Sequence, residues 1–157
     1  MVNQNTVRRN PKIAVAQIRY YDLNKKHNVD KIKQYIKLAK RAKADIVCFP
    51  EVSVSKIGGM HFRHNYIKQI REECKLNQIW CIASDELKIG KKVYNVAFLI
   101  DRKGDIKGHY RKINLYHERL VPGKKIPVFE TDFAKIGIVV CWDLAFPELF
   151  SKQQKVC

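Results

Sequence analysis

The fold of this chain is decided by residues 134–148, which read AKIGIVVCWDLAFPE. Residues 136–140 are mainly apolar and β-branched, a composition that predicts a strand buried on both faces. Asp143 or a neighbour can cap a helix that follows, and Pro147 suits the first turn of that helix. We therefore expect a buried strand that ends at Cys141 and turns sharply into a helix.

Cys141 is the candidate functional residue of this stretch. At a strand end beside a helix N-terminus, free backbone N–H groups and the positive end of the helix dipole favour a thiolate. The alternative is a structural cysteine that behaves as a small hydrophobic residue, and for an isolated cysteine this is the better interpretation. Two other stretches of the chain reverse that preference.

Length and composition indicate one globular domain. The chain has 157 residues, 46% of them hydrophobic, which suffices for a real core. No apolar run approaches the length of a membrane span, and residues 1–12 are too polar for a secretory signal. Five scattered cysteines without a Cys-x-x-Cys pair argue against a disulfide framework or a zinc site, so we expect a cytoplasmic protein.

The net charge of +16, from 31 basic and 15 acidic residues, raises the alternative of a nucleic-acid-binding protein. The lysines, however, are spread along the whole chain. Basic and aromatic residues do not alternate in a stripe of the kind that binds single strands. We therefore expect no nucleic-acid partner and no membrane partner.

The remaining pattern predicts an α/β domain with a mixed sheet and flanking helices. After a loose leader (1–11), we expect strands at 12–18, 44–49, 79–83 and 128–130, and helices at 28–43 and 62–76, with a polar connection at 22–28. A hairpin should pair 93–101 with 106–110, with Gly104 supplying the positive φ of the turn. An irregular charged stretch (111–123) follows.

Two further candidate residues stand at the ends of expected strands. Glu51 follows the strand at 44–49, and ligands of α/β sheets collect at such carboxyl ends. A glutamate there can act as a general base, or it can simply cap a turn. Lys112 follows the hairpin, where a buried ammonium could stabilise an oxyanion. In a chain with so many lysines, however, position alone is weak evidence that any one of them is catalytic.

Together, three motifs are far more specific than each alone: Phe-Pro-Glu at 49–51, Tyr-Arg-Lys at 110–112 and Cys-Trp-Asp at 141–143. In this order they resemble the nitrilase superfamily of carbon–nitrogen hydrolases, whose triad is Glu-Lys-Cys. The resemblance extends from about residue 12 to residue 150. It includes Ile-Ala-Val-Ala-Gln at 13–17, Tyr-Asn at 94–95, Ile-Asp at 100–101, Pro-Gly at 122–123 and Phe-Pro-Glu at 146–148.

The resemblance implies a role for five residues. Cys141 would be the nucleophile and Glu51 the general base. Lys112 and the backbone N–H of Trp142 would stabilise the oxyanion, and Glu118 would position the substrate. The implied substrate is a small linear amide or carbamoyl compound that releases ammonia through a thioester. No metal or organic cofactor is implied, and His61 and His64 are expected to be solvated rather than metal ligands.

The resemblance also implies a fold and an assembly. Members form a four-layer α-β-β-α sandwich, and this chain would be its N-terminal part, one domain (1–157) that is incomplete at the C-terminus. Residues 151–157 depart from the family pattern, so we expect a truncated chain that is poorly soluble and weakly active by itself. The full-length form would be a homodimer or higher oligomer. The alternatives are an inactive remnant, a fragment that needs a second-half partner, a nitrile hydrolase and a basic nucleic-acid-binding protein.

Overall fold

The fold was analysed in a computed structural model, which describes residues 10–18, 27–55 and 57–155. Most of the expected leader and of the polar connection at 22–28 lies outside these residues. The strands are β1 (Ile13–Val15), β2 (Ile46–Cys48), β3 (Trp80–Ile89), β4 (Lys92–Ile100), β5 (Ile106–Arg111), β6 (Val128–Glu130) and β7 (Lys135–Gly137). The helices are α1 (Val29–Arg41), α2 (Asn65–Asn77), a 3₁₀ helix at Cys141–Ala145, and α3 (Pro147–Gln154).

Strands β1 to β5 form one mixed sheet in their chain order. The pairs β1–β2 and β2–β3 are parallel, whereas β3–β4 and β4–β5 are antiparallel. Two antiparallel steps bring β5 back to the direction of β2, so these two strands end at the same edge of the sheet. This edge is the place where α/β sheets gather functional side chains.

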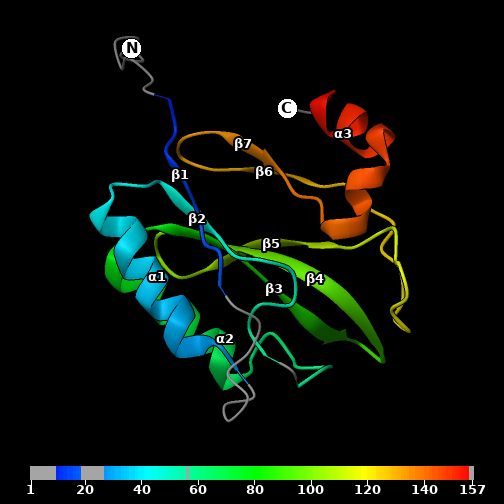
Figure 1. The fold of residues 1–157 in the computed structure, drawn as a ribbon, viewed down its shortest axis with the longest axis horizontal. Helices are drawn as coiled ribbons and strands as arrows, with labels where there is room; N and C mark the ends of the chain where they lie inside the picture. Colours follow the sequence, from blue (N-terminus) through cyan, green and yellow to red (C-terminus); the bar gives the residue numbers. More distant parts are fainter. Residues whose placement is uncertain (1–9, 19–26, 56, 156–157) are drawn as a thin grey trace.

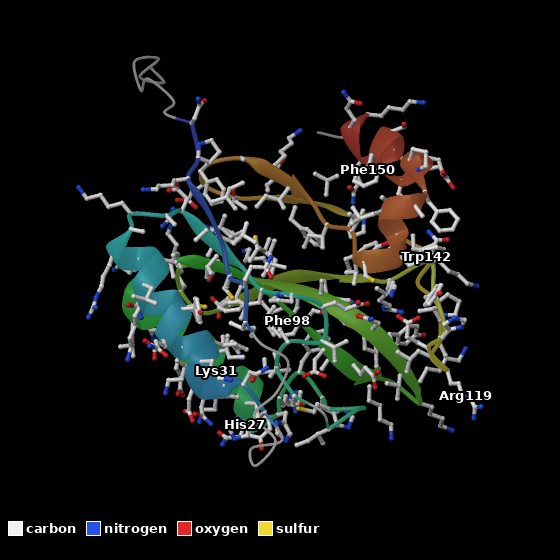
Figure 2. All side chains as sticks on the ribbon, in the orientation of Figure 1. His27, Lys31, Phe98, Arg119, Trp142 and Phe150 are labelled. Carbon is white, nitrogen blue, oxygen red and sulfur yellow. The ribbon has the colours of Figure 1, made fainter. Side chains whose placement is uncertain are left out.

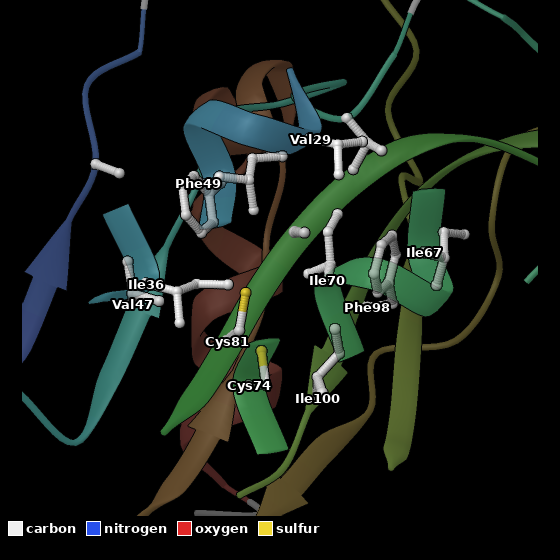
Figure 3. Packing of buried hydrophobic residues seen from close by; sticks show 14 of the residues in the cluster. Val29, Ile36, Val47, Phe49, Ile67, Ile70, Cys74, Cys81, Phe98 and Ile100 are labelled. Atoms are coloured by element: carbon white, nitrogen blue, oxygen red, sulfur yellow. The ribbon is translucent and has the colours of Figure 1, made fainter. Parts of the chain in front are cut away.

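Helices α1 and α2 cover one face of the five-stranded sheet (Figure 1). Val29, Ile32, Ile36 and Ala39 recur at helical spacing along α1 and are all buried. Figure 3 shows Cys74 of α2 beside Cys81 of β3, with Ile70 and Phe98 packed around them. This larger of the two buried clusters therefore forms between the sheet and the helices.

The opposite face of the sheet carries the hairpin β6–β7 and, beyond it, the 3₁₀ helix and α3 (Figure 1). Ile138 and Val140 pack there against Trp80, Leu99 and Tyr110 of the main sheet. Trp142 and Phe150 lie on the same side of the molecule and remain partly exposed (Figure 2). The hairpin unit (residues 128–154, from β6 through α3) thus docks as a separate layer on the main sheet.

The α/β class, the mixed sheet and the flanking helices are as the sequence predicts. The turn between β4 and β5 has Gly104 at φ +80°, also as predicted. One hairpin was missed: β3 does not stop at residue 83 but continues to Ile89 and pairs with β4 across Gly90. Ser84, Asp85 and Glu86 interrupt its apolar pattern, because this part of the strand carries polar groups that hold a neighbouring loop.

The prediction of a buried strand that runs up to Cys141 is wrong. Only Lys135–Gly137 forms a strand, it pairs with β6 alone, and its side chains are not buried on both faces. Ile138 and Val140 are buried, at 5% exposure each, but by packing on the main sheet and not by a sheet of their own. Pro147 does open α3, as expected. Asp143 caps the 3₁₀ helix instead of α3, because its Oδ2 accepts from the backbone N–H of the N-cap residue Val140.

In the part of the chain that the structure describes, no helix is long and apolar enough to cross a membrane.

Candidate active site

Glu51 stands in the loop after β2 and is held by the two central strands. Val52 follows it with φ +46°, a conformation that costs a β-branched residue free energy. The Val52 N–H donates to Ser84 Oγ (3.2 Å) of β3, which fixes the backbone. Asn95 of β4 donates from Nδ2 to Glu51 Oε1 (2.7 Å), which orients the carboxylate.

Lys112 follows the last residue of β5 and is only 1% exposed. Its Nζ lies 2.8 Å from Glu51 Oε1 and also donates to Glu118 Oε1. The backbone is fixed on both sides: its N–H donates to the Asn95 carbonyl (2.9 Å), and its own carbonyl accepts from Gly123 N–H (2.7 Å). Burial by itself would lower the pKa of Lys112, but the bonds to Glu118 and Glu51 outweigh burial, so the net shift is upward.

Glu118 belongs to the irregular loop after β5 and pairs with Lys112. Its Oε2 accepts from the Tyr116 backbone N–H (2.6 Å). Burial opposes ionisation of this carboxyl, but the Lys112 ammonium and nearby backbone N–H groups prevail and lower its pKa to about 2. At neutral pH Glu118 is therefore ionised beside the Lys112 ammonium.

Cys141 opens the 3₁₀ helix, with a positive φ of +47° and an exposed side chain. Burial raises the pKa of the thiol, the Glu51 carboxylate raises it further by a hydrogen bond and by its charge, and Lys112 and the Trp142 N–H act in the opposite direction. The net shift is upward, because burial and the Glu51 carboxylate outweigh the factors that favour a thiolate at this position. The helix that begins at Cys141 is a single 3₁₀ turn.

Asp143 ties the Cys141 turn to the main sheet and to the Lys112 loop. Its buried Oδ2 accepts from Tyr110 O–H (2.7 Å) and from the Val140 N–H (3.2 Å). Its Oδ1 accepts from both the backbone N–H (2.8 Å) and the side-chain amide (3.1 Å) of Asn114. Four bonds to one buried carboxylate fix the position of the turn two residues after Cys141.

The structure thus brings Glu51, Lys112, Glu118 and Cys141 together from three separate segments. Chemically, the cluster offers a protonated thiol with a carboxylate beside it as proton acceptor. It also offers a buried ammonium and, from Trp142, a backbone N–H directed at the sulfur. These are the parts that acyl transfer to a thiol requires.

His61 and His64, also named from the sequence, take no part in this cluster. His64 caps α2 instead, because its Nδ1 accepts from the Tyr66 N–H (3.2 Å). Among the described residues, no group of three His, Cys, Asp or Glu side chains is placed to hold a metal ion.

Three positioning residues were not found from the sequence: Ser84, Asn95 and Asp143, the last of which was assigned only a capping role. Asn95 stood in the Tyr-Asn motif at 94–95, and Asp143 stood in Cys-Trp-Asp, so each had a signal in the residues beside it. Ser84 had none, because its partner Val52 is remote in sequence and its strand was not expected to reach so far.

Comparison with known proteins gives the family. Residues 12–154 match the carbon-nitrogen hydrolase family. A probable nitrilase of Schizosaccharomyces pombe is 27% identical over 154 residues, covering 87% of this chain and 57% of that protein. An omega-amidase of Xenopus tropicalis is 28% identical over 147 residues, covering 80% of this chain and 52% of that protein. The chain therefore spans about half the length of these relatives.

Solved structures show the same fold. The crystal structure of an amidase from Nesterenkonia sp. has a TM-score of 0.75 at 23% identity, covering 88% of this chain and 58% of that one. A mutant of that amidase, with acrylamide added to its active-site cysteine, has a TM-score of 0.78 at 22% identity, over 89% of this chain and 61% of that one. With the match over residues 12–154, the chain belongs to the carbon–nitrogen hydrolase family.

Proposed function

We propose that this chain carries the catalytic residues of an amidase-type carbon–nitrogen hydrolase, acting on a small linear amide or carbamoyl compound. The proposal rests mainly on the convergence of Glu51, Lys112 and Cys141. Lys112 Nζ lies 2.8 Å from Glu51 Oε1, and the Cys141 thiol is hydrogen-bonded to the same carboxylate. Similarity to an omega-amidase supports amides as substrates, and similarity to a probable nitrilase makes nitriles the alternative to test.

In the proposed reaction, Cys141 Sγ attacks the amide carbon while Glu51 takes the thiol proton. The carbonyl oxygen becomes an oxyanion, which Lys112 and the Trp142 N–H stabilise. The C–N bond then breaks, Glu51 returns the proton to the leaving nitrogen, and ammonia departs from the thioester. Glu51 next deprotonates a water molecule that attacks the thioester, and the acid is released with the thiol restored.

Glu118 has a different part in this proposal. Its carboxylate is ionised at neutral pH and faces the same ammonium, so it can accept a hydrogen bond from the substrate amide while it keeps Lys112 in place. In this way it would position the substrate without taking up the thiol proton. The paired carboxylates also keep Lys112 charged, which its oxyanion role requires.

The test is ammonia release from a panel of linear amides and carbamoyl compounds and, separately, from the matching nitriles. We expect turnover of amides, loss of all turnover above background in Cys141→Ala, and a fall of about 10²–10⁴-fold in Glu51→Gln. Cys48→Ala is the matched control, because Cys48 is a half-buried thiol of β2 whose pKa burial raises to about 11. Its activity should equal that of the unaltered chain.

Two results would contradict the proposal. Ammonia release that survives Cys141→Ala would exclude the cysteine as nucleophile. Release from nitriles but from no amide or carbamoyl compound would assign the nitrile alternative. Circular dichroism of each variant separates loss of chemistry from loss of folding.

Two further predictions accompany the proposed reaction: a cytoplasmic location, and a homodimer or higher oligomer for the full-length form. The four described cysteines are free thiols, which agrees with a reducing compartment. Light scattering coupled to size exclusion measures the oligomeric state.

A further inference from the structure

A cavity separate from the candidate active site lies on the face of the sheet that α1 and α2 cover. Its volume is about 480 Å³, and strands β4 and β5 and the loop at 121–127 line it. Arg111 of β5 pairs with Val96, whose side chain belongs to the helix-side core, whereas Lys112 is turned toward Glu51 on the other face. The cavity is therefore distinct from the Glu51–Lys112–Cys141 cluster.

Five basic side chains line this cavity, which we call the Arg111 cavity: Lys92, His109, Arg111, Lys124 and Lys125. Of the residues that the structure describes, no acidic one lines it. Among the described residues, none of the ion pairs involves its arginine or its three lysines. Elsewhere in the chain, cations such as Arg71 and Arg102 do have carboxylate partners. Within the described part of the chain, the arginine and lysines of the Arg111 cavity thus have no carboxylate partner.

The guanidinium at the centre is held in place before any ligand arrives. Its carbon lies 4.6 Å from the centroid of the Tyr94 ring, and its Nε donates to His109 Nε2 (3.4 Å). Tyr94 itself is 9% exposed, so this stack forms the floor of the cavity. Stacking on the ring fixes the plane of the guanidinium. Its terminal N–H groups can then donate two parallel hydrogen bonds to a phosphate or a carboxylate.

We propose that the Arg111 cavity binds a small organic anion that carries phosphoryl groups. One arginine and three lysines offer more positive charge than a single carboxylate can balance, and phosphates accept several charge-assisted hydrogen bonds at once. The volume exceeds what a lone phosphate fills and lies in the range of small-molecule sites. An aromatic wall beside the cations suits an organic moiety attached to the phosphate.

Calorimetric titration of the 157-residue chain with adenosine 5′-monophosphate and with inorganic pyrophosphate tests this proposal. We expect saturable binding of one equivalent of at least one of them, weakened about tenfold or more by Lys124→Glu/Lys125→Glu and by Arg111→Gln. The control is Lys40→Glu/Lys107→Glu, which changes the net charge equally at two exposed lysines outside the cavity. Its affinity should stay within about twofold of the unaltered chain.

Equal weakening in the control variant would overturn the proposal, because binding would then follow net charge alone. The proposal would also be wrong if neither phosphate compound bound saturably, or if citrate bound more tightly than both. It would be wrong as well if polyuridylate displaced the bound compound at a lower concentration of phosphate charges, because the cavity would then be part of a nucleic-acid surface. An NMR titration that measures the pKa of His109, with and without the anion, tests the proposal without any variant. Burial, followed by Arg111, lowers the pKa of this imidazole, and a bound anion should raise it.

Discussion

Asp143→Asn is the most direct test of how the Cys141 turn is held. The substitution keeps the shape of the side chain but replaces one acceptor oxygen with an NH₂ donor. Each oxygen of Asp143 accepts two hydrogen bonds, from Tyr110 and Val140 on one side and from Asn114 twice on the other. Whichever way the amide turns, the backbone N–H of Val140 or of Asn114 then faces the new NH₂ group in a site that excludes water, and the Tyr110 hydroxyl or the Asn114 side chain has to turn to accept from it.

The magnitude follows from one lost bond and three weakened ones. A hydrogen bond to a buried charged group contributes about 1.5–3 kcal/mol, and the other three bonds together lose a similar amount once the charge is gone, so the total loss is about 3–6 kcal/mol. We expect the lower figure, because a neutral amide is easier to bury than a carboxylate. For a domain of this size, about 3 kcal/mol lowers Tm by about 6–12 °C.

Thermal unfolding followed by circular dichroism measures this change. Asp105→Asn is the control, since Asp105 is an exposed residue whose side chain pairs only with Arg71, itself 38% exposed. The control should shift Tm by less than about 2 °C. If Asp143→Asn shifts Tm no more than the control does, the four hydrogen bonds do not hold the turn, and the reasoning is wrong.

Three further predictions concern a thiol, a buried acid and a glycine. Alkylation of Cys141 by iodoacetamide, followed by mass spectrometry, should reach half its limiting rate at a pH above the ordinary thiol value, and Glu51→Gln should lower that pH, since Glu51 raises the thiol pKa. Burial raises the pKa of Asp85 to about 7. The folded state then holds the proton that the unfolded chain has lost above pH 4, so the free energy of unfolding should fall between about pH 4 and 7 in urea denaturation, and this slope should shrink in Asp85→Asn. Gly123→Ala should both lower Tm and reduce activity, because a Cβ there collides with the backbone carbonyl of Arg111; an unchanged Tm would contradict this.

Much of the architecture could be predicted from local patterns. The apolar stripe of α1, the β-branched run of β2 and the positive φ of Gly104 are set by neighbours in the sequence, and each was found where expected. The catalytic candidates came from motifs that stand at element ends. Glu51, Lys112, Glu118 and Cys141 do lie together, although the chemical role of each stays a prediction.

What could not be predicted depends on partners remote in the sequence. The second half of β3 looks polar because Asp85 accepts hydrogen bonds from Ser55, which belongs to another loop. Ile138 and Val140 look like a strand because they are buried, but a neighbouring layer buries them. The upward pKa shift of Cys141 comes from burial and then from the Glu51 carboxylate, both of which only the folded chain supplies.

The separate layering of the hairpin unit has a further consequence. The Glu51 carboxylate and the Lys112 ammonium are anchored on the five-stranded sheet. The sulfur of Cys141 belongs instead to the hairpin unit, whose own sheet has two strands. Such a unit can detach in a partial opening that leaves the larger sheet intact. Heat or mild urea would then disassemble the triad first, and enzymatic competence would fade while the far-ultraviolet spectrum still reported an ordered protein.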